Sequence, residues 1–202
     1  SILQTEDIDP ATTREFVSDI RDEASRLERI TEDLLRLTRL DSGAVEPPVR
    51  VAVKPVLERA VRMLQPVARQ RNISLTCQAD AAAAVLATEG DIHQILYNLM
   101  ENGVKYTVPG GFVRADVSID GAQVLITVSD NGIGIPAEDM PHVFERFYRV
   151  DKARSRQIGG TGLGLSIVGD TVQRRNGKIT VSSREGGGTE FVVRFPLAEV
   201  AE

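Results

Sequence analysis

Residues 130–136, with the sequence Asp-Asn-Gly-Ile-Gly-Ile-Pro, constrain the fold of this chain more than any other stretch. They follow a run in which apolar residues alternate as in a strand, and they precede residues 137–146, whose amphipathic pattern predicts a short helix. The glycines Gly132 and Gly134 would let the backbone approach a flat ligand closely. A buried carboxylate at Asp130 could accept a hydrogen bond from an exocyclic amine. The stretch therefore predicts a ligand-binding loop at the end of a strand.

The chain around this loop alternates between strands and helices. Period-two alternation predicts strands at 49–53, 73–77, 84–87, 112–119, 123–129, 178–184 and 189–195. Helical periodicity predicts helices at 56–69, kinked or shortened at Pro66, at 90–106 and at 162–175. Because the strands at 112–129 and 178–195 form antiparallel hairpins, we expect a mixed sheet covered by helices on one face, which is an α+β two-layer sandwich.

The glycine pair also matches a different motif. With Ala137 it fits the G-x-G-x-x-A pattern of dinucleotide-binding folds. That fold needs parallel strands joined by crossover helices, whereas here the glycines follow a hairpin around Asp120-Gly121. The dinucleotide interpretation is therefore disfavoured.

Composition excludes several classes of protein. The 202 residues carry a formal net charge of −5, which argues against general binding of nucleic acid. No apolar run is long enough to span a bilayer, so we expect no membrane contact in this segment. The single cysteine, Cys77, cannot form an internal disulfide, which fits a reducing compartment, and its place in an alternating run predicts a buried strand residue.

The N-terminal segment has the pattern of a long amphipathic helix. Asp9-Pro10 is a typical helix start, and Gly43 can end the helix in the left-handed conformation. The apolar seam consists of Phe16, Ile20, Leu27, Ile30, Leu34 and Leu37. Such a helix either packs on its own globular domain or forms half of a helical hairpin that pairs with a second chain, and we favour the second. The prolines at 47 and 48 mark a boundary, so we expect two domains, 1–45 and 46–202.

Two asparagines suit a cation and phosphate site. Asn98 and Asn102 are four residues apart in the predicted helix 90–106 and therefore share one face. Their carboxamide oxygens could ligate a hard cation such as Mg²⁺, which also holds phosphates. Lys105 lies one turn further on and could reach a phosphate. Taken alone, two surface asparagines would be the simpler interpretation.

Two further stretches suit an anionic ligand. Residues 159–164, Gly-Gly-Thr-Gly-Leu-Gly, open a helix, and the free N–H groups of a helix N-terminus bind anions. This is not a Walker loop, because no Gly-Lys-Ser/Thr closes it. Residues 146–160 hold several cations and few apolar side chains, which predicts either a mobile lid that is poorly ordered without a ligand or a solvated charge run.

Together these motifs resemble the ATP-binding domain of bacterial sensor histidine kinases. The order and spacing match the family's N box at 94–107, first glycine box at 130–136, F box at 144–149 and second glycine box at 160–164. Residues 26–43 are similar to the second helix of its dimerisation hairpin. The resemblance implies a mixed sheet under three helices, as in the gyrase, Hsp90 and MutL ATPases, preceded by a long dimerisation helix.

The resemblance also implies roles for individual residues. Asp130 would bind the adenine amino group, and the residues shaping the nucleoside pocket would be Tyr106, Gly132, Gly134 and Ile135. The residues beside the triphosphate would be Gly160, Thr161, Gly162, Leu163 and Gly164. Mg²⁺ or phosphate would be held by Asn98 and Asn102, with Lys105 and Arg149 near phosphate. Gly103 departs from the family, which usually has alanine there, at a cost of about 1 kcal/mol of helix stability.

The function implied is that of the catalytic region of a two-component sensor histidine kinase. Such a region binds ATP or ADP with Mg²⁺ and transfers the γ-phosphate to a histidine, from which it passes to an aspartate of a response-regulator receiver domain. The implied partners are a second copy of the chain, through the N-terminal helix, and the response regulator. The implied location is the cytoplasmic portion of a membrane-anchored bacterial sensor.

Two alternatives stay open beside this interpretation. An ATPase of the gyrase or Hsp90 type would place a glutamate base where Asn98 stands. A degenerate scaffold that only binds nucleotide would have lost its glycines or Asp130, and this chain keeps both.

The phosphoacceptor helix that the family carries, with its His-Glu-x-x-Thr-Pro pattern, is missing from the chain. The chain begins at Ser1, so we expect a segment truncated after that helix. Its two histidines, His93 and His142, lack the acceptor context, and a surface or packing role is the better interpretation for each. We therefore expect this chain to bind ATP without phosphorylating itself.

Overall fold

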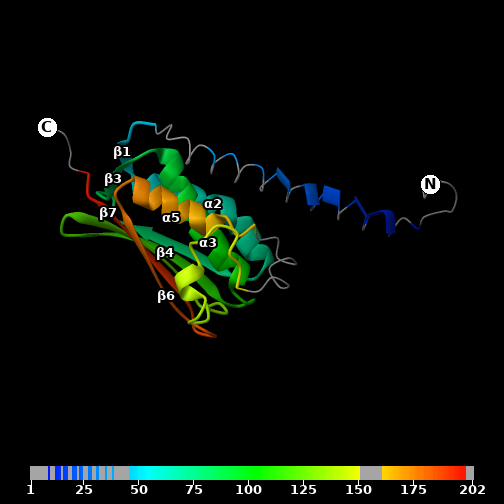
Figure 1. Cartoon of the computed structure of the whole chain (residues 1–202). Helices are drawn as coiled ribbons and strands as arrows, with labels where there is room; N and C mark the ends of the chain where they lie inside the picture. Colours follow the sequence, from blue (N-terminus) through cyan, green and yellow to red (C-terminus); the bar gives the residue numbers. More distant parts are fainter. Residues whose placement is uncertain are drawn as a thin grey trace.

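The computed structural model describes residues 46–150 and 161–198, together with single positions between 9 and 38. Figure 1 shows the arrangement of the elements. They are β1 (Val49–Ala52), α2 (Val53–Gln70), β2 (Ser74–Ala79), β3 (Ala84–Ala87), α3 (Glu89–Tyr106), β4 (Phe112–Asp120), β5 (Gln123–Asp130), the 3₁₀ helix η1 (Met140–His142), α5 (Gly164–Arg174), β6 (Lys178–Arg184) and β7 (Gly188–Pro196).

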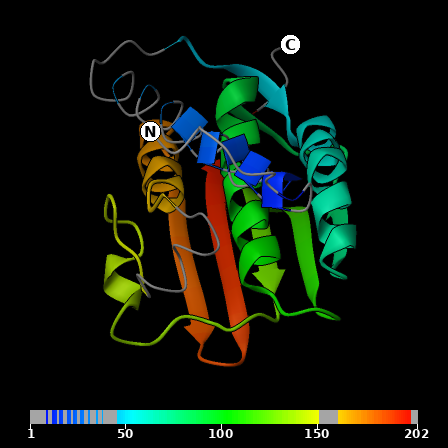
Figure 2. The same ribbon diagram turned by 90° about the vertical axis from the view of Figure 1, so that its right-hand side faces the viewer.

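The main sheet has five strands in the order β2-β4-β5-β7-β6. β2 pairs parallel with β4, and the other three pairs are antiparallel. Helices α2, α3 and α5 lie side by side on one face of this sheet (Figure 2). β1 and β3 form a separate two-stranded antiparallel sheet. The predicted α+β two-layer sandwich, with a mixed sheet under three helices, is therefore confirmed.

The core lies between the sheet and the helices. Alternate residues of the central strands point inward, as Val124, Ile126 and Val128 of β5 do, and all three are buried. From the helix side, Leu57 and Leu96 are fully buried in the same cluster. Each such side chain contributes about 1.5–3 kcal/mol by leaving water, so the one-sided apolar patterning of strands and helices determines the layered fold.

Helix α3 is anchored at its start by a capping box and lies close to the sheet near its end. The Thr88 hydroxyl accepts from the Asp91 N–H at 3.1 Å, and the Thr88 N–H donates to Asp91 Oδ2 at 3.3 Å. At Gly103, a Cβ would lie 2.9 Å from Cγ1 of Val113 on β4. The absent methyl group of Gly103 thus leaves room for the valine and lets helix and strand approach closely.

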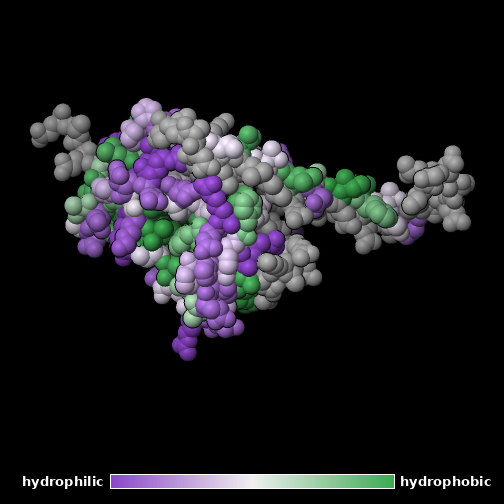
Figure 3. Space-filling model, viewed as in Figure 1, coloured by the Kyte–Doolittle hydropathy of each residue, from purple (hydrophilic) through white to green (hydrophobic). Residues whose placement is uncertain are grey.

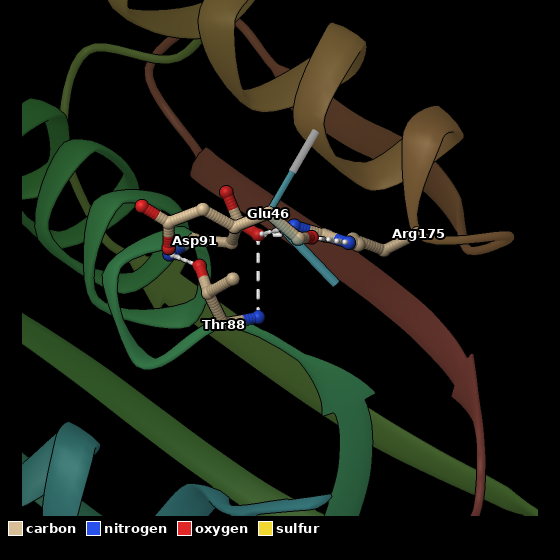
Figure 4. A network of polar contacts seen from close by, with 4 residues as sticks. All are labelled: Glu46, Thr88, Asp91 and Arg175. Atoms are coloured by element: carbon tan, nitrogen blue, oxygen red, sulfur yellow. Dashed lines mark hydrogen bonds and ion pairs between the residues drawn. The ribbon is translucent and has the colours of Figure 1, made fainter. Parts of the chain in front are cut away.

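Arg175 joins three parts of the chain just after α5. Its guanidinium lies 2.7 Å from Asp91 Oδ2 through both Nε and Nη2, and its Nη1 donates to the Glu46 carbonyl at 3.2 Å (Figure 4). Only 5% of the Arg175 side chain is exposed, so this charge is compensated within the protein. Glu46 is thereby tied to the start of α3 and the end of α5.

Two predicted helices that contain a proline differ from their predictions. Residues 137–146 form no α-helix; a 3₁₀ turn at Met140–His142 contains Pro141, whose ring restricts the preceding residue and removes a backbone donor. By contrast, α2 continues through Pro66 to Gln70, because Leu64 and Ala68 are buried on either side and hold the helix on the sheet. The predicted shortening of α2 was therefore wrong.

Two smaller predictions were also wrong. Val53 begins α2 instead of ending the first strand. Cys77 lies on β2 but is exposed, not buried. β2 is an edge strand with a neighbouring strand on one side only. A side chain of β2 can therefore be exposed to solvent even where the alternating pattern predicts that it faces the core.

The described positions of the N-terminal segment have helical backbone at 12–14, 16–17, 20–21, 23–24, 27–28, 31, 35 and 38. From the predicted seam, Phe16, Ile20 and Leu27 are exposed apolar side chains, as the green atoms along this segment in Figure 3 illustrate. Ile30, Leu34 and Leu37 lie outside the described residues.

Candidate functional site

Asp130 ends β5 with one carboxylate oxygen held and the other available. Oδ1 accepts hydrogen bonds from the N–H groups of Gly132, at 2.8 Å, and Thr189, at 3.3 Å. Oδ2 has no hydrogen-bond partner among residues 46–150 and 161–198. Burial raises the pKa of this carboxyl above the usual range of an aspartate, and the two backbone hydrogen bonds oppose part of that rise. Asp130 is therefore a half-buried, oriented acceptor with one oxygen free for a ligand.

The glycine loop after Asp130 is shaped by close contact with neighbouring backbone. A Cβ at Gly132 would lie 2.5 Å from the Tyr106 carbonyl oxygen. Gly134 has a φ of +72°, and a Cβ there would overlap the Arg184 carbonyl oxygen. Both positions thus require glycine because of the protein's own chain, before any ligand is considered.

The loop brings together residues from the end of α3 and from β6. The Ile133 N–H donates to the Tyr106 carbonyl at 3.1 Å, and the Ile135 N–H donates to Ser183 Oγ at 2.8 Å. The side chain of Ile135 is half-buried against the main core. A backbone hydrogen bond therefore attaches the loop after Asp130 to the end of α3 at Tyr106, and the Ser183 side chain attaches Ile135 to β6.

The β6–β7 hairpin completes this end of the site, and sequence reasoning missed its role. Gly188 has a φ of +86°, and a Cβ there would overlap the Asp130 carbonyl oxygen. Thr189, the next residue, supports the Asp130 carboxylate with its N–H. The sequence predicts residues 178–195 only as an antiparallel hairpin. The signal for a further role is a third consecutive glycine, Gly188, at the start of the second strand, where the turn itself needs none.

Asn98 links α3 to the second glycine box. The residue is buried, and its Nδ2 donates to the carbonyl of Gly164, the first residue of α5, at 3.2 Å. Oδ1 of Asn98 and the half-buried side chain of Asn102 have no hydrogen-bond partner within the described parts of the chain. Two carboxamide oxygens one turn apart on α3 thus fit a small hard cation that also binds phosphate. No cluster of three or more acidic, histidine or cysteine ligands occurs among the described residues.

The cationic candidates differ in their surroundings. Lys105 forms an ion pair with Glu101 at 2.9 Å, so it is already partnered on its own helix. In Arg149, by contrast, Nε and Nη2 are buried and have no hydrogen-bond partner among the described residues. Buried guanidinium nitrogens are nearly always paired, so Arg149 is suited to an anion that the protein does not itself provide.

The second glycine box is described only from Thr161 onward. Thr161 Oγ1 accepts from the Leu163 N–H at 3.2 Å, and Leu163 is buried. The Phe147 N–H donates to the Gly162 carbonyl at 2.9 Å, and a Cβ at Gly162 would lie 2.9 Å from the Phe147 carbonyl carbon. The F box and this glycine box therefore meet. Gly160 and the cations at 152, 154 and 156, with most of the predicted lid, lie outside the described residues.

Both histidines are built into the same domain as the glycine boxes. His93 lies on α3 and stacks on Tyr97, with ring centroids 5.9 Å apart. His142 lies on η1, and its Nδ1 is 2.7 Å from Glu145 Oε1.

The fold and these contacts together define a class of protein. The sheet is mixed and lies under three helices, and Asp130 at a strand end has one free carboxylate oxygen. The glycine-rich start of α5 faces α3, which carries the two asparagines. This is the architecture of an ATPase domain that binds nucleotide between the loops at the end of its sheet and its helices. Residues 87–199 match the family described as histidine kinase-, DNA gyrase B- and HSP90-like ATPases, and the chain belongs to this family.

Individual relatives narrow the comparison to histidine kinases. The chain is 39% identical over 189 residues to the sensor-like histidine kinase SenX3 of Mycolicibacterium smegmatis, covering 93% of this chain and 49% of the relative. It is 40% identical over 192 residues to the probable sensor histidine kinase TcrY of Mycobacterium tuberculosis, covering 94% and 39%. The structure of full-length ShkA in complex with AMPPNP superposes with a TM-score of 0.78 at 30% identity, covering 94% of this chain and 40% of that one. The chain thus carries a histidine-kinase-type catalytic ATPase domain and spans half or less of the length of these relatives.

Proposed function

We propose that this chain binds ATP with Mg²⁺ at the site around Asp130 and passes the γ-phosphate to a histidine that lies outside it. The observation that carries the proposal is the Asp130 carboxylate, whose Oδ1 is held by two backbone N–H groups while Oδ2 has no partner among the described residues. A fixed acceptor in a half-buried place matches the exocyclic amine of adenine. Guanine carries a carbonyl at the corresponding position, so it would face the carboxylate with an acceptor.

The phosphates would lie between α3 and the start of α5. Asn98 and Asn102 offer oxygens to the cation, Arg149 offers unpaired guanidinium N–H groups, and the N-terminus of α5 favours negative charge. Gly160, Thr161, Gly162, Leu163 and Gly164 would surround the triphosphate, and Lys105 would need to leave Glu101 to contact it. When bound, Mg²⁺ would neutralise charge on the β- and γ-phosphates.

Hydrolysis in the manner of gyrase or Hsp90 is the less suitable reaction for this site. It needs a general base beside the γ-phosphate, and Asn98 stands where that base would be. A carboxamide cannot take up a proton at neutral pH, and Nδ2 of Asn98 already donates a hydrogen bond to the Gly164 carbonyl. The site is better suited to transfer of the γ-phosphate to an incoming nucleophile whose own base orients it.

The full assembly that we propose has further parts. Residues 1–45 would belong to a dimerisation hairpin and 46–202 to the catalytic domain. The exposed apolar side chains Phe16, Ile20 and Leu27 support pairing with a second copy of the chain through the N-terminal helix. The partner receiving the phosphate would be the receiver domain of a response regulator. Among the described residues, no helix has the length and apolar character needed to cross a bilayer. From the likeness to sensor histidine kinases, we propose that this segment is the cytoplasmic part of a membrane-anchored sensor.

The test of nucleotide binding is calorimetry with ATP, ADP and GTP in the presence of Mg²⁺. We expect the unaltered chain to prefer ATP over GTP and Asp130→Asn to lower ATP affinity by about 1–3 kcal/mol, because the amide would present a donor to the amine. Asp120→Asn, at the exposed end of β4, is the matched control and should leave affinity unchanged. Equal affinity for GTP and ATP in the unaltered chain would refute the role of Asp130.

A further inference from the structure

One serine hydroxyl joins the glycine loop to the β6–β7 hairpin. Ser183, on β6, is half-buried, and its Oγ accepts from the Ile135 N–H at 2.8 Å. The same Oγ lies 2.8 Å from the Gly188 carbonyl oxygen and 3.0 Å from Thr189 Oγ1. A carbonyl can only accept, so the single hydroxyl proton of Ser183 goes to Gly188, and the Thr189 hydroxyl donates to Ser183. All the hydrogen-bonding capacity of this small side chain is therefore used between the loop and the hairpin.

Ser183 also stands in line with Asp130 across the sheet. In the strand register Ser183 pairs with Thr189, and Thr189 pairs with Asp130 on the next strand. Thr189 in turn donates its N–H to Asp130 Oδ1. Three neighbouring residues, Ser183 on β6, Thr189 on β7 and Asp130 on β5, thus connect the serine hydroxyl to Asp130 Oδ1. Because Oδ1 is held in place, the other carboxylate oxygen, Oδ2, is oriented toward the ligand.

A second contact from the hairpin acts in the same direction. The Gly186 N–H donates to the Ile133 carbonyl at 2.7 Å, so the loop residues 133 and 135 are both bound to the hairpin. Because the Ile133 contact uses backbone atoms alone, no side-chain change removes it directly. The Ser183 hydroxyl is the part of this attachment that mutation can remove on its own.

We propose that Ser183 is a positioning residue for base selectivity: its hydroxyl holds the 132–135 loop and Thr189 in register with Asp130, and so sets how well the site distinguishes adenine from guanine. This inference rests on the proposed nucleotide-binding function. Without the hydroxyl, the Ile135 N–H and the Thr189 hydroxyl each lose a partner, and the loop can shift relative to the carboxylate. A shift of that kind weakens a directional contact to the base far more than it weakens contacts to the phosphates.

The experiment compares ADP and GDP affinities, by calorimetry or competition, in variants of the whole chain with Mg²⁺ present. We expect Ser183→Ala to lose roughly tenfold in ADP affinity with little change for GDP, so that the ADP-to-GDP preference falls by about the same factor. Ser183→Thr keeps the hydroxyl and should restore the preference. Ser182→Ala, an exposed neighbour on the same strand, is the matched control and should behave as the unaltered chain.

The outcomes separate the possible failures. If Ser183→Ala keeps the preference, or loses ADP and GDP affinity in equal proportion, the hydroxyl has a structural role only and the inference is wrong. If the unaltered chain shows no preference for ADP, both the inference and the proposed function fail. Should Ser183→Ala not fold, Ser183→Cys replaces the hydroxyl with a somewhat larger and weaker hydrogen-bonding group, and we expect a partial loss of preference; an undiminished preference there would overturn the inference equally.

Discussion

The Arg175 guanidinium lies 2.7 Å from Asp91 Oδ2 through two of its nitrogens, and so connects the C-terminal end of α5 to the capping box of α3. The same side chain donates to the Glu46 carbonyl, at the junction of the two predicted domains (Figure 4). Since α3 carries the asparagines and α5 begins at the second glycine box, this contact lies at the far ends of the two helices that would hold the phosphates. It therefore links these two helices at the ends that lie away from the proposed phosphate site.

Removing Arg175 should destabilise the domain strongly. We expect Arg175→Ala to lower the free energy of unfolding by about 3 kcal/mol, because it leaves the Asp91 carboxylate without its charged partner. The measurement is urea unfolding followed by circular dichroism. Arg59→Ala is the matched control: its ion pair with Glu89, at 2.6 Å, is exposed on both sides and should contribute less than about 1 kcal/mol. Equal effects of the two variants would contradict this account of Arg175.

Gly103→Ala tests the close packing of α3 on β4. Helix propensity alone predicts that alanine stabilises α3 by about 1 kcal/mol. The structure predicts the opposite sign, a loss of about 1–3 kcal/mol, because the new methyl group would meet Val113 Cγ1 at 2.9 Å. Adding Val113→Ala should make the glycine substitution tolerable, so unfolding of the two single variants and the double variant should show strong coupling. Additive effects would show that the contact at Gly103 is unimportant.

The pH dependence of ADP affinity should report the Asp130 carboxyl. Burial raises its pKa, so on acidification the carboxylate takes up a proton at a higher pH than an exposed aspartate does, and the acceptor for the base amine is lost. We expect ADP affinity to fall as the pH drops through this raised pKa. Because the phosphates of ADP also titrate, the measured quantity is the ratio of affinities of the unaltered chain and Asp130→Asn at each pH. That ratio should approach one in acid; a ratio that stays constant would exclude Asp130 as the titrating group.

The same carboxyl has a defined effect on stability. An acid whose pKa is raised on folding binds its proton more tightly in the folded state, so the ionised form costs stability above the folded pKa. This cost decreases as the pH falls through the folded pKa toward that of the unfolded chain. The gain in stability and the loss of ADP affinity on acidification therefore have opposite signs, and both should disappear in Asp130→Asn.

The chain should bind ATP without labelling itself. Phosphoryl transfer needs the nucleophile about 3–3.5 Å from the phosphorus and in line with the leaving oxygen. His93 is stacked on Tyr97 within α3, and His142 at the end of η1 is paired with Glu145. Both histidines are therefore held within the catalytic domain itself. Incubation with γ-labelled ATP should give no acid-labile label, and supplying the missing acceptor helix on a partner chain should restore labelling. Robust label on His93 or His142 would contradict this prediction.

Local patterns in the sequence were enough to predict much of this protein. The alternation in 112–129 specified a hairpin, and the structure has it as β4 and β5 with nearly the same bounds. The spacing of Asn98 and Asn102 on one helix, and the position of Asp130 at a strand end, also follow from the sequence. These features depend on periodicity and turn chemistry within a few residues, which is why they can be predicted without knowing what packs against what.

Tertiary structure alone decided the rest. The sequence signals of Ser183 and Thr189 are those of ordinary strand residues, and they matter only because β6 and β7 are placed beside Asp130 by the strand order of the sheet. The requirement for glycine at 134 likewise comes from the Arg184 carbonyl, fifty residues away in the chain. Cys77 became exposed because its strand lies at the edge, and α2 continued past Pro66 because its neighbours on the helix are buried. In each case the deciding atoms belong to another part of the chain, and local patterning holds no information about contacts between distant segments.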